Sequence, residues 1–506
     1  MHSNKSQTIA KNTGFLYFRM LFNLAVTLYT SRVVLEVLGV EDFGIYNVTG
    51  GVIAMFFFLT TSLSSSTQRF LTFEMGREGE GKLERVFNVS FSIHMIIAGL
   101  IIILGETIGL WFVQNKLVIP EGRMHAALAV YHLSIVMAVL GIINVPFTAL
   151  IIARERMNVF AIVSIVETCL RLLIVFVLLV IAYDKLILYA VLSGLVSFLI
   201  FLIYQVVCRK NFSESRLKKL IWDKDLFKQI GGFAVWVMNG NLAVMGYTQG
   251  LNILLNLFFG PSVNAARGIG VQVQNAVTGF SSNFQTSINP QITKSYASGD
   301  LAYMHKLIIT GSKLSFLLLF MISLPIVIEA NFVLNQWLVS VPEYSVSFVR
   351  LTLVIALITT LSHSLIVSVH ATGKLRKFQL IEGTILLLIV PIAYWCLKLG
   401  YPPECVYVIH LLVAVVAQIA RIVIVLPMIN MSIMDYINKI VLRIIPSFFL
   451  AVLITVIPFY YMDENWLRLF MVCLAAGFSV VALSYTTALD TRERDVLTGL
   501  VKSFIK

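Results

Sequence analysis

One stretch of the chain carries polar and guanidinium side chains at helical spacing within an otherwise apolar sequence. It runs from Asn264 to Pro290 and reads NAARGIGVQVQNAVTGFSSNFQTSINP. On a helix, with about 100° between residues, five of its side chains share one face: Arg267, Gln274, Thr278, Ser281 and Gln285. Such groups can hydrogen-bond a polar ligand, but hydrocarbon cannot solvate them. This stripe must therefore face protein or water.

Two further segments show the same pattern. Asn241, Thr248, Asn252 and Asn256 fall on one side of segment 229–256, and TTSLSSSTQ occupies residues 60–68. Small polar residues also join membrane helices through hydrogen bonds between them, and this alternative stays open for any single residue. Three such stripes favour a hydrated cavity, with Asn241 and Asn252 among its lining residues.

Arginines inside apolar segments are candidates for binding a charged ligand. Arg19 shares one side of segment 14–38 with Asn23 and Thr30, and Arg267 begins the stripe described above. An arginine within a membrane is costly and is a functional hypothesis by default. Its planar fork of donors suits phosphate. The alternative is that both arginines reach the membrane surface, since each lies roughly 9 Å from a segment end at 1.5 Å per residue.

Two charge pairs have helical i,i+4 spacing. Glu167 and Arg171 lie in the middle of segment 159–182, where they form either a structural lock or a site that couples protons or cations. Arg32 and Glu36 lie near a segment end, where they either neutralise each other or Arg32 extends to the membrane surface. Three more glutamates are nearer to segment ends, where a solvated or gating role is expected: Glu106, Glu329 and Glu382.

Enzymatic chemistry finds little support in the sequence. The five cysteines are scattered and show no metal-ligand spacing. There is no Walker A sequence, no GxSxG, and no glycine-rich dinucleotide motif that follows a strand. We therefore predict a protein that is not an enzyme and that has no catalytic residues, cofactor or metal.

The elements that carry these residues are membrane-spanning helices. Of the 506 residues 58% are hydrophobic and 13% are charged, against roughly 25% charged in soluble domains. Apolar runs long enough to cross a bilayer recur along the chain, and they predict an all-α protein with about 14 spans. The predicted spans are 14–38, 43–67, 86–113, 124–152, 159–182, 188–208, 229–256, 261–287, 307–334, 346–371, 379–399, 405–428, 443–461 and 467–488.

The distribution of basic residues orients these spans. With the N-terminus in the cytoplasm, the predicted external segments hold only five of the 38 Lys and Arg residues: Lys116, Arg123, Lys185, Lys398 and Arg468. Cytoplasmic segments carry the excess of basic residues in membrane proteins. Both termini are therefore predicted to be cytoplasmic, and the net charge of +12 is a topology signal rather than a sign of nucleic-acid binding.

The chain contains an internal repeat. LGVEDFGIYNV (Leu38–Val48) follows the first span and FGPSVNAARGI (Phe259–Ile269) follows the seventh, so that Gly39 matches Gly260. Repeats with an even number of spans are related by an axis along the membrane normal. We predict two six-helix bundles related by a pseudo-twofold axis, a basic linker, and two additional helices with a cytoplasmic tail, at residues 1–208, 229–428, 209–228 and 429–506 respectively.

These features resemble the polysaccharide-exporter, or O-antigen flippase, branch of the multidrug/oligosaccharidyl-lipid/polysaccharide flippase superfamily. The resemblance rests on the repeat, the LG…FGIYNV turn and the INPQITKSYASGD segment, and it covers nearly the whole chain. It implies a fold like that of the multidrug-and-toxin exporters. It also implies that Arg19 and Arg267 correspond to cavity arginines in the first and eighth spans of lipid II flippases.

The function implied is transport of undecaprenyl-pyrophosphate-linked oligosaccharide across the bacterial inner membrane by alternating access. The cargo would be an O-antigen, capsule or exopolysaccharide unit. The expected partners are this lipid-linked oligosaccharide, membrane lipids and other polysaccharide-assembly proteins, with no nucleic acid and a monomeric state. A sodium- or proton-coupled multidrug exporter is the alternative within the same superfamily.

Overall fold

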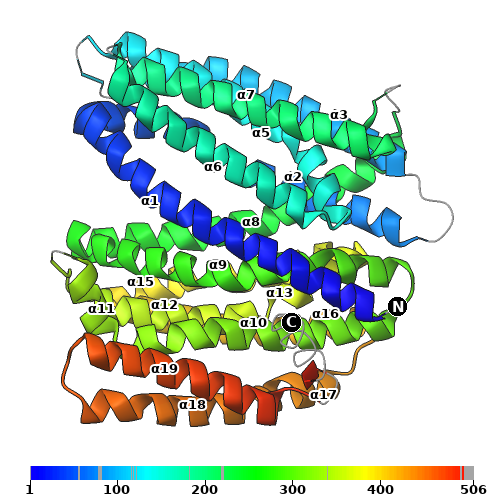
Figure 1. Ribbon diagram of the computed structural model, residues 1–506, viewed down its shortest axis with the longest axis vertical. Helices are drawn as coiled ribbons and strands as arrows, with labels where there is room; N and C mark the ends of the chain where they lie inside the picture. Colours follow the sequence, from blue (N-terminus) through cyan, green and yellow to red (C-terminus); the bar gives the residue numbers. More distant parts are fainter. Residues whose placement is uncertain are drawn as a thin grey trace. The chain divides into compact units, whose positions relative to one another are not determined.

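The computed structural model is helical throughout (Figure 1). It describes residues 2–54, 57–77, 83–115, 117, 119–120, 122–181, 183–217, 222–338, 340–490 and 493–494, and these ranges contain no strand. The predicted all-α class is therefore confirmed. The side chain of Arg32 lies outside the described set, so its pairing with Glu36 stays a prediction.

The chain divides into two compact units, which we call the N-terminal lobe (Ala10–Met238) and the C-terminal lobe (Met1–Ile9 with Asn239–Lys506). The boundary lies inside one long helix, α8. The first turns of α8 pack on α2: Phe233 meets Phe70 edge to face at 5.8 Å, and Ser66 Oγ donates to the Ile230 carbonyl at 3.0 Å.

The N-terminal lobe is built from long helices that run beside one another. They are α1 (His2–Ala54), α2 (Phe57–Gly76), α3 (Leu83–Leu104), α4 (Leu110–Asn115), α5 (Met124–Ala153), α6 (Met157–Val180), α7 (Lys185–Asn211) and the start of α8 (Lys224–Phe259), with a π-helical turn η1 (Gly105–Gly109) and a 3-10 turn η2 (Ser213–Ser215). Its main core is apolar and includes Leu71, Phe87, Phe147 and Leu178.

The C-terminal lobe continues from α8 with shorter and more interrupted helices. They are α9 (Pro261–Ala297), α10 (Leu301–Ile328), α11 (Ala330–Trp337), α12 (Ser345–Thr360), α13 (His363–Thr372), α14 (Arg376–Leu387), α15 (Ile389–Lys398), α16 (Cys405–Met428), α17 (Ile433–Tyr436), η3 (Ile437–Val441), α18 (Leu442–Tyr461), α19 (Trp466–Leu483) and η4 (Ser484–Ala488). Several predicted spans are thus broken: α12 and α13 meet at Leu361–Ser362, and α14 and α15 meet at Leu388.

The helices confirm a membrane protein. Within the described residues, 11 helices are long and apolar enough to cross a bilayer. Of the three other predicted spans, 14–38 lies in α1 and 261–287 lies in α9, while the described residues of 43–67 belong to the end of α1 and to α2. Large apolar side chains on the outside of both lobes, such as Leu173, Leu257 and Phe449, are exposed. Lipid would cover such side chains in a bilayer.

The internal repeat is visible in the backbone. Gly39 interrupts α1 with φ 76° and ψ 169°, and Gly260 separates α8 from α9 with φ 80° and ψ −172°. The two values are nearly the same, and this region of conformational space is essentially restricted to glycine. The predicted match of Gly39 with Gly260 is therefore confirmed, because each lobe bends its chain at the equivalent point.

Two buried ion pairs fasten the last two long helices to the C-terminal lobe. Arg468 at the start of α19 donates from Nε and Nη2 to the two oxygens of Glu329, both at 2.7 Å. Beyond η4, Glu493 pairs with Lys313 of α10 at 2.6 Å. Glu329 is only 1% exposed, so the expectation of a solvated carboxylate is wrong there: the chain supplies a guanidinium in place of water.

The glycine bends give a first prediction. Gly39→Ala and Gly260→Ala should each lower the free energy of unfolding by about 1–3 kcal/mol, because an L residue is strained at these angles. No neighbouring atom lies within 4 Å of an added Cβ at either site, so the cost is one of backbone conformation. Gly99→Ala and Gly477→Ala are matched controls in open helical positions. Thermal unfolding in detergent should show destabilisation at the bends and none at the controls.

The buried pair of Glu329 and Arg468 gives a second prediction. Arg468→Met should destabilise the protein by about 3–5 kcal/mol, because it leaves a buried carboxylate without its partner. The double variant Glu329→Met/Arg468→Met should regain most of that loss. Glu464→Gln is the control, since Glu464 is half exposed and lies 3.7 Å from the same guanidinium. Equal stability of the single and double variants would show that the pair does not fasten α19.

Candidate functional site

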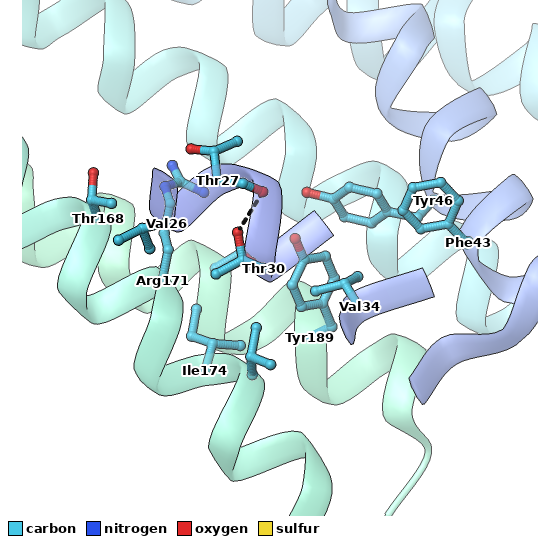
Figure 2. Close-up of a pocket in the computed structure, with 12 residues that line it drawn as sticks. Val26, Thr27, Thr30, Val34, Phe43, Tyr46, Thr168, Arg171, Ile174 and Tyr189 are labelled. Atoms are coloured by element: carbon cyan, nitrogen blue, oxygen red, sulfur yellow. Dashed lines mark hydrogen bonds between the residues drawn. The ribbon is translucent and has the colours of Figure 1, made fainter. Parts of the chain in front are cut away.

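The N-terminal lobe contains a cavity of about 300 Å³ between α1, α6 and α7. This volume is at the lower end of the ~300–1,000 Å³ of ligand pockets. Its lining mixes hydroxyl, aromatic and aliphatic groups with one guanidinium (Figure 2). The lining residues are Val26, Thr27, Thr30, Val34, Phe43, Tyr46, Thr168, Arg171, Ile174, Val175, Tyr189 and Ser193.

The cavity has an exposed rim and a buried floor. Thr27 and Arg171 are exposed, whereas Val34, Val175 and Ser193 are buried. In Figure 2 the hydroxyls of Tyr46 and Tyr189 point toward Thr30, whose own hydroxyl donates to the Thr27 carbonyl at 3.1 Å. A ligand entering at the rim would meet hydrogen-bonding groups on several sides.

Asn23, a predicted cavity residue, joins α1 to α6 beside this cavity. Its Nδ2 donates to Ser164 Oγ at 2.9 Å, and its Oδ1 accepts from Thr168 Oγ1 at 2.8 Å. Both ends of the amide are therefore used in contacts between helices. Asn23 holds the wall on which Thr168 lies, and it does not itself line the cavity.

The predicted pair of Glu167 and Arg171 forms on α6. Arg171 donates from Nε and Nη2 to the same oxygen, Oε1 of Glu167, at 3.0 and 2.8 Å. The Glu167 side chain is 34% exposed and the Arg171 side chain is 45% exposed. Arg171 lines the cavity while Glu167 does not. The pair brings a guanidinium to the cavity with its charge already balanced.

A clamp of three charged residues positions two walls of the cavity. Arg123 donates from Nη1 to Asp184 at 2.6 Å and from Nε to Asp42 at 2.9 Å, and its Nη2 also contacts Asp42. Asp184 caps α7, accepting from the amides of Leu186 and Ile187. Asp42 follows the bend at Gly39. The clamp therefore fixes the helix ends that carry Tyr46 on α1 and Tyr189 on α7.

The same clamp shifts the proton affinity of its members. The hydrogen bond from Arg123 to Asp184 is the main cause that raises the pKa of Arg123. For Asp184, burial acts to raise the pKa, but the bonds from Arg123 and from the α7 amides outweigh it and lower the pKa below its ordinary value of 3.8. Both groups lie in the connections between spans. The charged forms of Arg123 and Asp184 are thus the ones that the folded lobe stabilises.

Arg19 lies on α1 apart from the cavity lining. Its guanidinium stacks over the Phe160 ring of α6, 4.7 Å from the ring centroid. An aromatic face of this kind stabilises a cation and orients its plane. The structure thus holds Arg19 and Asn23 against the same helix, α6, but it does not place Arg19 among the groups around Arg171.

In the C-terminal lobe, Arg267 connects α9 to α8. Its Nη2 donates to the Thr248 carbonyl at 2.8 Å, and its Nη1 approaches Asn252 Oδ1 at 3.4 Å. The sequence stripes on α8 and α9 therefore meet at this point. Asn241 lies about two turns before Thr248 on α8 and is half-buried.

The remaining residues of the α9 stripe divide into two groups. Ser281 and Gln285 are buried against the end of α12, where Ser281 Oγ lies 3.3 Å from Thr360 Oγ1 and Gln285 Nε2 donates to the Thr360 carbonyl at 3.2 Å. Thr278 donates to the carbonyl of Gln274 one turn back, at 2.8 Å, and both are half-buried. The stripe is thus largely engaged with neighbouring helices.

A different polar face of α9 is open. Gln272, Asn275 and Ser282 are exposed, and so are Gly268 and Ala276. At about 100° per residue these positions fall within about 120° of arc on one side of the helix. The sequence pattern identified α9 as a polar membrane helix, but it did not distinguish which of two polar faces packs inside the lobe.

A buried polar network surrounds the break between α12 and α13. Arg421 of α16 donates from Nε to Glu382 Oε1 at 2.8 Å and from Nη1 to Ser362 Oγ at 2.8 Å. Ser362 in turn donates to Gln418 Oε1 at 2.6 Å. The solvated role expected for Glu382 is wrong, because its carboxylate is paired inside the lobe. Glu106 is exposed and lies 3.0 Å from His132 Nδ1.

Most of the lining residues were not identified from the sequence, among them Tyr46, Tyr189 and Ser193. Tyr46 lies in the quoted repeat motif, but its ring could equally have anchored a membrane surface. Tyr189 and Ser193 are four residues apart on α7, and this spacing was the available signal. In the described ranges, no group of three or more His, Cys, Asp or Glu side chains is placed to hold a metal ion.

Comparison with known sequences identifies relatives. Residues 9–296 match the family described as polysaccharide biosynthesis protein. The uncharacterized membrane protein EpsK of Bacillus subtilis (strain 168) is 23% identical over 289 residues, which are 56% of this chain and 55% of that protein. The chain thus spans about half the length of the curated relative that it matches.

Solved structures share the fold. An outward-facing multidrug resistance MATE family transporter of the MOP superfamily has a TM-score of 0.72 at 14% identity, covering 84% of this chain and 98% of that chain. A MATE mutant has a TM-score of 0.73 with the same identity and coverage. The MATE transporter ClbM in complex with Rb⁺ has a TM-score of 0.66 at 11% identity, covering 83% and 94%.

The clamp at Arg123 gives a prediction on pH. Because the pKa of Asp184 is lowered in the folded protein, its charge stabilises the fold above the ordinary pKa, and this contribution is lost as the pH falls through the folded value. Asp184→Asn keeps a good helix cap but removes the charge. The free energy of unfolding of wild type should exceed that of this variant by about 1 kcal/mol at pH 7. The difference should shrink below pH 3.8 in thermal unfolding scans.

The control is Asp435→Asn, which removes the carboxylate of a half-exposed pair with Lys439. It should change the stability little at any pH. A difference between wild type and Asp184→Asn that stays constant down to pH 3 would contradict the role assigned to the Asp184 charge.

Proposed function

Because the chain belongs to the polysaccharide biosynthesis protein family, we propose that it moves an undecaprenyl-pyrophosphate-linked oligosaccharide across the bacterial inner membrane. The cargo is an O-antigen, capsule or exopolysaccharide unit, and both termini of the transporter are cytoplasmic. The proposal rests on the family match over residues 9–296 in a chain with the fold of MATE transporters. We infer a transporter rather than an enzyme, and the family match and the MATE fold support this.

The polar groups of each lobe support a hydroxyl-rich cargo. The N-terminal lobe offers the cavity with its threonine, tyrosine and serine hydroxyls. The C-terminal lobe offers the exposed amides and hydroxyl of α9, Gln272, Asn275 and Ser282. Neutral amides and hydroxyls both donate and accept hydrogen bonds, as the hydroxyl groups of sugars do.

Arg19 and Arg267 are the proposed ligands of the pyrophosphate. A guanidinium has five N–H donors in a fixed plane. Arg267 uses two of them on Thr248 and Asn252 within the lobe, and the described residues take no more. Arg19 is oriented by the Phe160 ring. Both groups are thus held in place before a phosphate arrives, which lowers the entropic cost of binding.

Alternating access requires two states of the transporter that differ in affinity for the cargo. A ligand shifts such an equilibrium only by its difference in affinity between the states. Each lobe has its own apolar core, as expected for units that move as rigid bodies. An ion gradient, the membrane potential or removal of the cargo on the far side would supply the direction, and Glu167 with Arg171 is the candidate coupling pair.

The second candidate is a sodium- or proton-coupled multidrug exporter. The fold similarity to a multidrug resistance MATE family transporter favours it. The charge of the cavity weighs against it, because Arg171 is the one charged residue in the lining. A cationic drug or a coupling cation would meet that guanidinium, while the Glu167 carboxylate is already paired with it and lies outside the lining.

The proposal predicts that both arginines matter for transport. In proteoliposomes carrying fluorescent undecaprenyl-pyrophosphate-linked oligosaccharide, Arg19→Ala and Arg267→Ala should each slow flipping about tenfold or more, as loss of a charge-assisted hydrogen bond implies. Lysine at either position should retain part of the rate, since it keeps the charge and loses the fork.

Arg350→Ala is the matched control. Arg350 also lies in the C-terminal lobe and also donates to a backbone carbonyl, that of Val327 at 3.0 Å, yet it is assigned no role in binding. Its flipping rate should equal that of wild type. Unchanged flipping in both test variants would remove the cargo-binding assignment, and drug efflux that depends on sodium or protons, without flipping, would support the second candidate.

A further inference from the structure

The cavity of the N-terminal lobe is lined by both hydrogen-bonding and apolar groups. We propose that it binds a single neutral sugar ring of the cargo, held by Ser193, Arg171 and the tyrosine pair. This inference rests on the proposed function and adds to it a site, distinct from the pyrophosphate arginines, that recognises the glycan. Four observations support it.

The first observation is an unpartnered hydroxyl at the floor. Ser193 is 1% exposed and lines the cavity, and its Oγ has no hydrogen-bond partner among the described residues. A buried polar atom without a partner is costly, and nearly all such atoms in proteins are paired. A ligand hydroxyl that reaches the floor would satisfy it.

The second observation is the free edge of Arg171. Its Nε and Nη2 bond Glu167, whereas Nη1 makes no hydrogen bond to any described residue. Nη1 can therefore donate to an oxygen of a ligand. The adjacent Glu167 already balances the positive charge, and the lining holds no second cation. A phosphate would meet a neutralised guanidinium and a nearby carboxylate, so a neutral oxygen acceptor fits better.

The third observation is the aromatic wall. The rings of Tyr46 and Tyr189 pack edge to face, with centroids 4.9 Å apart, and both hydroxyls point toward Thr30 (Figure 2). Each tyrosine combines an apolar body with a polar tip. A sugar ring has the matching character, with C–H groups on its faces and hydroxyls around its edge.

The fourth observation is the size and the floor of the cavity. Val34, Ile174 and Val175 are buried aliphatic residues of the lining, and they can cover the C–H groups of a ring. A volume of about 300 Å³ holds one ring rather than a whole oligosaccharide unit. The site would therefore bind one sugar residue of the glycan and make no contact with the others.

The test measures binding of small sugars directly. Saturation-transfer NMR on the purified full-length protein would use methyl glycosides of glucose, galactose, mannose, rhamnose and N-acetylglucosamine. Inorganic phosphate, the anionic probe, has no carbon-bound protons and would be tested in parallel by calorimetric titration. At least one methyl glycoside should bind wild type. Ser193→Leu, which fills the floor, should abolish that signal, and Ser193→Ala should weaken binding about fivefold, the value of one neutral hydrogen bond.

Two further variants make the result specific. The double variant Glu167→Gln/Arg171→Gln keeps the site neutral but removes the guanidinium, and it should weaken glycoside binding about tenfold. Ser197→Ala is the matched control, because Ser197 lies one turn further on α7, donates to the Ser193 carbonyl at 3.0 Å and is outside the lining. It should bind like wild type, and the melting temperature of each variant reports on folding.

Any of three outcomes would overturn the site. Wild type could fail to bind every glycoside, or a folded Ser193→Leu variant could bind as well as wild type. The third is tight phosphate binding that depends on Arg171. The flipping assay separates this failure from that of the proposed function. Wild type that flips lipid-linked oligosaccharide with no loss in Ser193→Leu retains the function and loses the site. Glycoside binding without any flipping of lipid-linked cargo retains the site and loses the function.

Discussion

Hydrocarbon offers no hydrogen bonds, and this constraint governs every polar group in the protein. Backbone amides satisfy it by forming helices, and side chains satisfy it by pairing within a lobe. Arg421 with Glu382, Arg468 with Glu329 and Asn23 with Thr168 are instances of the same solution. A polar group left over after this pairing is therefore informative. The hydroxyl of Ser193 is one of several such buried atoms among the described residues, and it lies at the cavity together with the free edge of Arg171.

The broad architecture could be predicted because it depends on composition and period. Apolar length identified the spans, and the recurrence of a glycine after spans 1 and 7 identified the repeat, since the bend needs angles that other residues avoid. The break between α12 and α13 could not be predicted. The interruption at Leu361–Ser362 follows from tertiary contacts, in which Arg421, Gln285 and Tyr436 satisfy groups at the break. The local sequence there contains neither proline nor glycine.

The site was harder to predict than the fold. Periodicity places residues on a common helix face, but it does not say what that face meets. Ser281 and Gln285 share the predicted stripe with Arg267, yet they pack against α12, whereas the adjacent face of α9 stays open. Glu167 and Arg171 were found because an i,i+4 pair is visible in one helix. Tyr46 and Ser193 lie on different helices, and only the packing of α1 against α6 and α7 brings them together.

The pairing of Lys313 with Glu493 has a bearing on how the protein is made. The two residues are 180 positions apart, so α10 leaves the ribosome long before its counter-charge exists. Until then Lys313, which is buried in the folded protein, must contact water, lipid headgroups or an insertion factor. Completion of the C-terminal lobe is thereby tied to the arrival of its final residues. A nascent chain that stops short of Glu493 would lack the carboxylate that balances this ammonium group.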